Sequence, residues 1–245
     1  MRKILLLVVV VASLVAGCTE SFVEPDPKAR GLEYYPLHVG DYHIYNVRDI
    51  KYQHNVAVVD SIFQMREVVT DTFRNQANEL TYKVVRSIRK NESGAWLEDS
   101  VLTVVKSEHM VVLSKNNTKY IKLVFPVEEG KKWLGDAFNN NIVNDLATDP
   151  YLRKESYSYQ NVGKPLQIGE NTYPESLTVV QGNPADNVVF KDERKEVYAK
   201  GVGKVYRLFN RVVYASCTPE DCVYGEGYKL NGHERTEELA SYGKL

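Results

Sequence analysis

The chain has 245 residues, and 31 lysine and arginine residues stand against 32 aspartate and glutamate residues, so the formal net charge is −1. The basic residues are scattered singly along the sequence, which excludes the dense basic patch typical of nucleic-acid-binding proteins. We therefore expect no nucleic acid partner. The composition also includes 17 tyrosines, which favour β-strands.

The N-terminus has the order of a bacterial secretion signal. Arg2 and Lys3 precede an unbroken small or apolar run of about 14 residues, whereas a membrane-spanning helix needs about 20. The run ends in Leu14-Val15-Ala16-Gly17-Cys18, which resembles the lipobox of bacterial lipoproteins. We predict a lipoprotein signal peptide over residues 1–17 and lipidation of Cys18. The alternative is an ordinary signal peptide with a chance cysteine.

The residues after the predicted cleavage site have the composition of a tether. Residues 18–31 are acidic, contain two prolines and show no periodicity, so the folded domain is expected over residues 32–245. Cys18 is followed by Thr19 instead of the aspartate that usually retains lipoproteins in the inner membrane. We therefore expect a lipid anchor in the outer membrane, with the domain facing either the periplasm or the cell surface.

Alternation of apolar and polar residues dominates the rest of the chain. In residues 203–214, for example, Val205, Arg207, Phe209 and Arg211 share one face of a predicted strand. One short helix could lie at residues 141–149, and turn sequences occur at residues 91–94, 115–118, 181–184 and 231–232. Strands are predicted at residues 41–49, 56–71, 79–90, 95–105, 109–115, 119–125, 154–161, 172–181, 187–199, 204–215, 222–230 and 234–242. This pattern predicts an all-β, antiparallel fold of about a dozen strands in a strongly curved sheet, a barrel or a sandwich.

One short motif occurs twice. Residues 35–42 read aromatic, proline, aliphatic, two variable residues, glycine and a following aromatic, and residues 125–133 repeat that order. Proline restricts the backbone, the aliphatic side chain is suited to a core, and glycine can take a turn that other residues cannot. The repeat suggests two similar halves, residues 32–124 and 125–245. The residues predicted to have this structural role are Pro36, Leu37, Gly40, Tyr42, Pro126, Gly130 and Trp133.

Two cysteines remain after Cys18. Cys217 and Cys222 are separated by Thr-Pro-Glu-Asp, a turn sequence, and an exported protein can oxidise such a pair. We predict a disulfide that clips a hairpin tip. A metal site or a redox pair are the alternatives, but a metal would need more ligands than two thiols and the distant His233.

Sequence motifs for catalysis are missing. There is no G-x-S-x-G or S-x-x-K nucleophile motif, and Gly201-Val202-Gly203 is too short for a dinucleotide fingerprint. The nearest approach to a metal site is His38, Asp41 and His43, which we interpret as the start of a strand. Adjacent acids such as Glu237 and Glu238 face opposite sides of a strand and so form no acid and base pair. We predict no catalytic residue, no metal and no cofactor.

Several segments resemble a group of bacterial outer-membrane lipoproteins of uncharacterised function. The resemblance rests on the lipobox, "YYPLHVGDYHIY" (residues 34–45), "IKLVFPVEEGKKW" (residues 121–133), "EVYAKGVGKVY" (residues 196–206) and the C-terminal pair of cysteines. It covers nearly the whole mature chain. Membership would imply a lipid anchor and would add no activity or ligand.

Two functions follow as hypotheses. The first is a non-enzymatic, lipid-anchored envelope protein that binds a partner or contributes to an assembly. The alternative is a carrier or sensor that holds a hydrophobic or glycan ligand in the hollow of a curved sheet. Protein, glycan and lipid are accordingly the candidate ligands, beside the membrane contacted through Cys18.

Overall fold

The computed structural model describes residues 29–140, 154–214, 216–217, 222–223 and 227–245. The predicted signal peptide, Cys18, most of the tether and the predicted helix at residues 141–149 lie outside these residues. Within the described part of the chain, no helix is long and apolar enough to cross a membrane.

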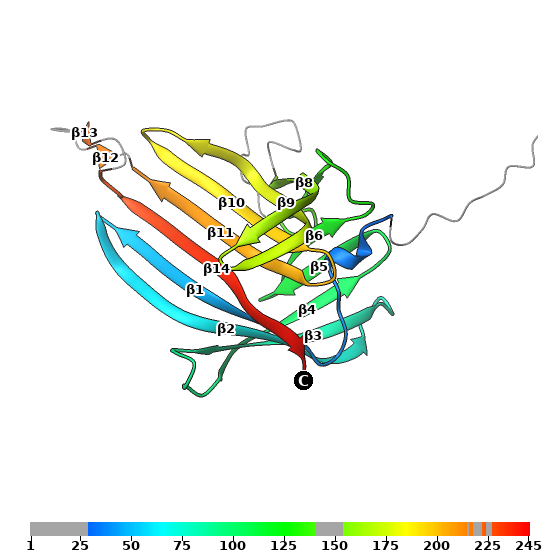
Figure 1. Cartoon of the computed structure of the whole chain (residues 1–245). Helices are drawn as coiled ribbons and strands as arrows, with labels where there is room; N and C mark the ends of the chain where they lie inside the picture. The colour runs from blue at the N-terminus through cyan, green and yellow to red at the C-terminus, as the bar shows by residue number, and fades with distance from the viewer. Residues whose placement is uncertain (1–28, 141–153, 215, 218–221, 224–226) are drawn as a thin grey trace, which may run out of the picture.

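The described residues form one 12-stranded antiparallel sheet and a separate two-stranded pair (Figure 1). The all-β prediction is thereby confirmed. A short 3-10 helix, η1 (Leu32–Tyr34), precedes the strands. The strands are β1 (Asp41–Gln53), β2 (Val56–Arg74), β3 (Leu80–Arg89), β4 (Leu97–Lys106), β5 (Met110–Lys115), β6 (Thr118–Val124), β7 (Lys132–Leu134), β8 (Ser156–Ile168), β9 (Asn171–Asp186), β10 (Phe190–Ala199), β11 (Gly203–Val213), β12 (Ser216–Cys217), β13 (Cys222–Val223) and β14 (Asn231–Lys244).

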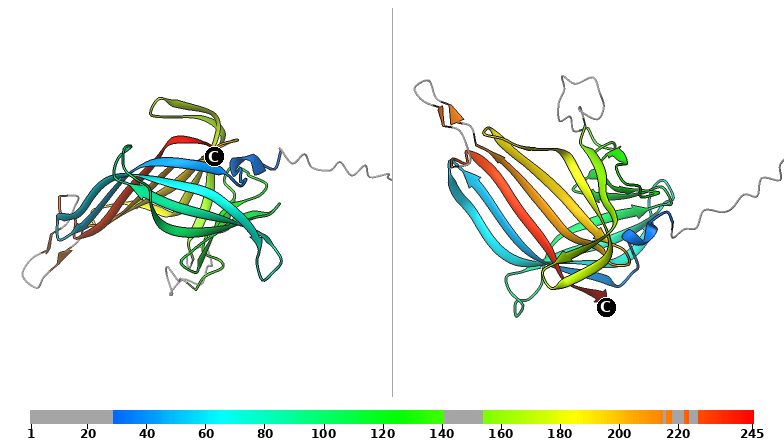
Figure 2. Two further views of the ribbon diagram at one scale, coloured as in Figure 1. Left: turned by 90° about the horizontal axis from the view of Figure 1, so that it is seen from below. Right: turned by 45° about the horizontal axis from the view of Figure 1, so that its top comes forward.

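The large sheet curls into a nearly closed barrel (Figure 2). Its strand order is β6-β5-β4-β3-β2-β1-β14-β11-β10-β9-β8-β7, so each half of the chain supplies six neighbouring strands. The two ends of this order meet at a seam, where the Ile121 amide donates to the Gly135 carbonyl at 2.8 Å. The Trp133 indole donates to the Ile121 carbonyl at 3.0 Å, and the Tyr159 hydroxyl donates to the Val124 carbonyl at 2.8 Å. These contacts tie together the two edges of the sheet.

Some strands extend beyond the others. β3 pairs with β2 only over Gln64 to Arg74, so the first part of β2 pairs with β1 alone. The long strands β1, β2, β14, β11 and β10 therefore project past the shorter β3 to β6 at one end of the barrel (Figure 1).

Residues 32–40, which we call the floor segment, run across the other end. The Lys106 ammonium at the end of β4 donates to the Leu32 and Tyr35 carbonyls at 3.0 and 2.7 Å. On the opposite wall, the Gly201 amide in the β10–β11 turn donates to the Glu33 carbonyl at 2.9 Å. Because these bonds reach two different walls, the segment closes this end of the barrel.

The floor segment brings apolar side chains into the barrel. Tyr34 and Leu37 are 4% and 8% exposed. We call these two residues and the apolar wall residues clustered with them the apolar floor; its buried wall members include Val69, Val84, Leu102 and Val104. This burial is the usual source of folding free energy, about 25 cal/mol for each Å² removed from water.

The two copies of the repeated motif meet at this end. Leu37 of the first copy belongs to the same buried cluster as Phe125 of the second, and the Val127 amide donates at 3.0 Å to the carbonyl of Arg30, just before the first copy. Gly40 and Gly130 both have positive φ, at 93° and 76°, so both need the freedom of glycine. Each copy leads into the first strand of a six-strand half, β1 or β7.

The structure differs from the prediction in several places, among them one short strand, one predicted strand and two predicted turns. β7 is a three-residue strand that was not predicted, because so short a segment has no detectable alternation. The strand predicted at 222–230 is wrong over its last part: among its described residues, pairing is seen at Cys222–Val223, and residues 227–230 form no strand. The predicted turns at 181–184 and 231–232 are also wrong, because β9 and β14 run through them.

Candidate functional site

A cavity of about 460 Å³ lies inside the barrel, above the floor segment. This volume is within the usual range for small-molecule sites, roughly 300 to 1,000 Å³. Gly203 lies at the floor end, against Pro36 and His43, whereas Arg211 lies eight residues further along β11, or roughly 26 Å. The Arg211 side chain is half exposed, so the cavity reaches solvent at the end away from the floor.

The lining combines rings with charges. Six aromatic side chains face the cavity: Tyr35, Tyr45, Tyr120, Tyr157, Tyr198 and Phe209. Seven cationic side chains do so as well: Arg86, Lys115, Lys122, Arg194, Lys204, Arg207 and Arg211. The acidic members are Asp41, Glu67, Glu155 and Glu196.

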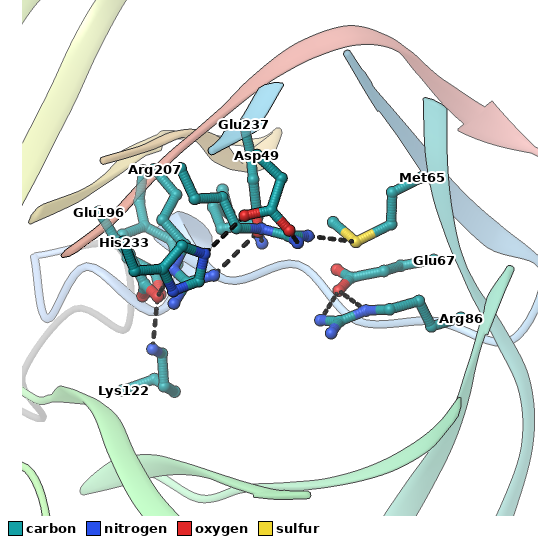
Figure 3. Close-up of polar contacts among 12 residues, drawn as sticks. Asp49, Met65, Glu67, Arg86, Lys122, Glu196, Arg207, His233 and Glu237 are labelled. Carbon is teal, nitrogen blue, oxygen red and sulfur yellow. Dashed lines mark hydrogen bonds and ion pairs between the residues drawn. The ribbon is translucent and has the colours of Figure 1, made fainter. Parts of the chain in front are cut away.

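Glu237 on β14 is the centre of the largest ion-pair network (Figure 3). Its side chain is 1% exposed, and its carboxylate accepts from Lys204, Arg207 and Arg235, each at 2.9 Å. Arg235 also pairs with Asp49 at 3.2 Å. Although burial opposes ionisation, these three cations hold the pKa of Glu237 well below its usual range.

Arg207 links this network to a second carboxylate, Glu196 on β10. Glu196 accepts from the Lys122 ammonium at 2.6 Å and from the Tyr198 hydroxyl at 2.6 Å, while the Arg207 Nε lies 3.7 Å away. Burial alone would raise the pKa of Glu196, but Lys122 and Arg207 outweigh it and hold the pKa at about 2. The carboxylate is therefore ionised at any physiological pH.

A third pair joins β2 and β3. The Arg86 Nε donates to Glu67 at 3.1 Å, and both side chains are largely buried. Burial would raise the pKa of Glu67, but Lys204 and Arg86 lower it to about 2. We call the set of inward-facing charges in these three groups the charged wall; its members are Glu67, Arg86, Lys122, Glu196, Lys204, Arg207, Arg235 and Glu237.

A further network lies on β9 and β10. Arg194 is 7% exposed and is held between Asp192, at 2.6 Å, and Glu155, at 2.7 Å. Its guanidinium occupies the place where a side chain at Gly182 would lie, and Gly182 has φ of 73°. The glycine that sequence analysis assigned to a turn instead makes room for Arg194.

Two of the carboxylates that line the cavity, Glu67 and Glu196, are poorly suited to acid and base catalysis. A general acid or base works best with a pKa near the operating pH, whereas Glu67 and Glu196 have pKa values of about 2. The rings and the fixed charges are instead suited to hold and orient a bound molecule.

The three residues that come closest to a metal site, His38, Asp41 and His43, do not converge on one point. His38 and Asp41 pair with each other, and His43 has a different partner. The His38 Nδ1 lies 3.0 Å from Asp41, outside the cavity lining, whereas the His43 Nε2 lies 2.7 Å from the Val202 carbonyl. Burial lowers the pKa of His43, so its neutral imidazole donates to that carbonyl. Among the described residues, no group of three or more His, Cys, Asp or Glu side chains is placed to hold a metal ion.

The remaining predicted site residues lie at the ends of the barrel. Leu37, Trp133 and Pro126 lie at or near the floor, and Tyr42 contacts Gly243 at the start of β1. Cys217 and Cys222 are opposite each other in the β12–β13 pair. The disulfide between them stays a prediction, because the Cys217 side chain lies outside the described residues.

Sequence reasoning missed the charged wall. Seven of the basic residues that are scattered along the sequence converge inside the barrel, since each of them takes an inward position on its own strand. One signal was present: Arg207 and Arg211 alternate with Val205 and Phe209 on the face that becomes the interior. Charged residues at apolar positions of a strand indicate a polar interior.

Comparison with known proteins identifies no family. No family model matches the chain, and no curated protein matches it. One solved structure is similar, that of a Bacteroides fragilis protein described as exported, with a YmcC-like fold. The sequences are 9% identical, the match covers 86% of this chain and 98% of the other, and the TM-score is 0.35. At that TM-score the similarity assigns neither fold nor function.

Proposed function

We propose that this protein is a lipid-anchored envelope protein that holds a small ligand in the hollow of its barrel and catalyses no reaction. The observation that carries the proposal is the cavity, which is closed at one end by the floor segment and lined by six rings. The cavity favours a carrier or sensor over a purely structural assembly protein. A barrel whose interior is filled with side chains would instead have favoured a structural assembly protein.

The non-enzymatic part rests on the electrostatics of the lining. Glu67, Glu155, Glu196 and Glu237 each accept from at least one cation. The cations hold the pKa values of Glu67, Glu196 and Glu237 well below the usual range, so these three carboxylates stay ionised near neutral pH and are poorly suited to exchange protons with a substrate.

The ligand function is tested by filling the cavity. Leu113 lines it, so Leu113→Trp should exclude a ligand, whereas Leu97→Trp, at a position 66% exposed on β4, is the matched control. Native mass spectrometry of protein purified from its own envelope should show a bound small molecule with the wild type and the control, but not with Leu113→Trp. Circular dichroism and thermal melting check that both variants fold. An identical mass profile for all three proteins would contradict the proposal.

The lipid anchor is tested separately. Cys18→Ala should abolish palmitate labelling and release the protein from membranes. A processed protein that still carries labelled palmitate without Cys18 would show that the anchor is elsewhere. Loss of labelling with membrane retention would instead point to a protein partner.

A second candidate function, docking to a partner protein, is favoured by exposed apolar side chains. They lie at the end of the barrel away from the floor, in the β1–β2 and β9–β10 hairpins (Figure 1). Val56, Val58 and Val188 are 60%, 55% and 63% exposed. Val58→Lys and Val188→Lys should abolish crosslinking to such a partner and leave the bound small molecule in place.

A further inference from the structure

Lys115, at the end of β5, differs from every other cation that lines the cavity. Each of the others forms an ion pair with a carboxylate, whereas Lys115 has neither an ion pair nor a hydrogen bond within the described part of the chain. Asp99 is the carboxylate that acts on it, from beyond ion-pair distance. Burial lowers the pKa of Lys115, and the nearby Arg86 lowers it further.

The ion pairs around the cavity also single out Lys115. Seven cationic and four acidic side chains line the cavity. Asp192 and Glu237, which lie behind the lining, pair with Arg194 and Arg207 and so add two negative charges. Six of the seven lining cations thus have a carboxylate partner, and Lys115 is the one without an ion pair among the described residues. Lys115 is partly buried, and a cation that loses water without gaining a counter-ion carries a cost, so a site of this kind is complementary to an anion.

Apolar and aromatic surface lies beside the free charge. Leu113 shares a strand face with Lys115, two residues away, and Tyr120 lies directly opposite Leu113 on β6. Both side chains line the cavity. A tyrosine ring next to a cation suits a ligand that has a flat or ring-shaped body and a negatively charged group.

We propose that the cavity binds a small anionic ligand, whose carboxylate or phosphate pairs with Lys115 and whose ring packs against Tyr120. This inference rests on the proposed function, because it names the chemical class of the molecule that the barrel holds. It also narrows the expected hydrophobic or glycan ligand to one that carries a negative charge.

The test uses matched probes that differ in charge alone. Calorimetric titrations of the processed lipoprotein in lipid nanodiscs compare glucuronate with the neutral glucuronamide, at constant ionic strength. Inorganic phosphate, titrated separately, distinguishes a phosphate site from a carboxylate site. We expect glucuronate or phosphate to bind, and glucuronate to bind about tenfold more tightly than glucuronamide or better, since a charge-assisted hydrogen bond to Lys115 is lost with the amide.

Two variants complete the test. Lys115→Met keeps the length of the side chain and removes its charge, so anion binding should weaken about tenfold or more. Lys119→Met removes an exposed lysine from the same hairpin and should change nothing. Equal affinity for glucuronate and glucuronamide, unchanged anion binding by Lys115→Met, or no binding of either anion would overturn the proposal. If native mass spectrometry still showed a bound molecule that Leu113→Trp excludes, the carrier function would stand, with a neutral ligand.

Discussion

The apolar floor and the charged wall occupy the same barrel interior and are built on different principles. At the floor, Tyr34 and Leu37 pack against valines and leucines. A few residues further along the strands, Glu196 and Glu237 are 4% and 1% exposed and are surrounded by cations. Burial of the first set is favourable by itself, whereas burial of the second is favourable only when every charge has a partner.

This difference teaches that stability alone does not account for the wall. Replacement of a buried ion-pair cluster by apolar residues of similar volume is often neutral or stabilising. The same interior already shows such an apolar solution at the floor. The proposed ligand therefore gives a wall of paired charges around a cavity a role that stability of the fold does not.

Acidification should break the wall and leave the floor intact. Glu67 and Glu196 have folded-state pKa values of about 2, below the ordinary 4.5. Their contribution to stability is complete above about pH 4.5 and is lost as the pH falls toward 2, at roughly 3 kcal/mol for each carboxylate. Urea unfolding at a series of pH values between 7 and 2 measures this loss. A free energy of unfolding that stays constant over this range would show that the wall adds nothing to stability.

Glu237→Gln should be the most damaging single change in the wall. It leaves Lys204, Arg207 and Arg235 without their shared carboxylate, and an uncompensated buried charge costs about 3–5 kcal/mol. Glu238→Gln is the control, because the neighbouring side chain is exposed. Urea unfolding at neutral pH compares the two. Equal stability of the two variants would mean that water reaches the wall freely.

The sequence predicted the strands better than the interior. Alternation of side chains depends on neighbouring residues alone, so β10 and β11 could be found directly. The contacts of the wall join distant segments: Lys122 and Glu196 are 74 residues apart and meet only once the whole sheet has curled. Their pairing depends on the register of every strand between them, which no local pattern specifies.

The repeated motif shows where local reasoning succeeded. Its glycines were expected to take special backbone conformations, and Gly40 and Gly130 both have positive φ. The sequence did not indicate that the two copies would meet at the floor. That contact depends on closure of the barrel, which brings Leu37 and Phe125 into one buried cluster.

Leu37→Ala tests the floor by itself. Removal of a buried leucine side chain should lower the free energy of unfolding by about 2–4 kcal/mol, because it leaves a cavity in a packed region. Val39→Ala, two residues along and 46% exposed, should cost far less. Both effects should be the same at pH 7 and pH 4, since no titrating group is removed. A strong pH dependence would mean that floor and wall unfold as one electrostatic unit.

Lys115→Met gives the smallest and most informative effect. Because Lys115 is a partly buried cation without an ion pair among the described residues, its removal should stabilise the ligand-free protein by up to about 1 kcal/mol, or roughly 2–4 °C in melting temperature for a domain of this size. Lys119→Met should stay within about 0.5 kcal/mol of the wild type. Because the wild type gains stability from an anion that the variant cannot bind, saturating glucuronate should cancel or reverse the difference. Destabilisation by Lys115→Met without any anion would mean that Lys115 already has a favourable interaction within the protein. The charges of the wall would then be explained by stability of the fold and not by a ligand.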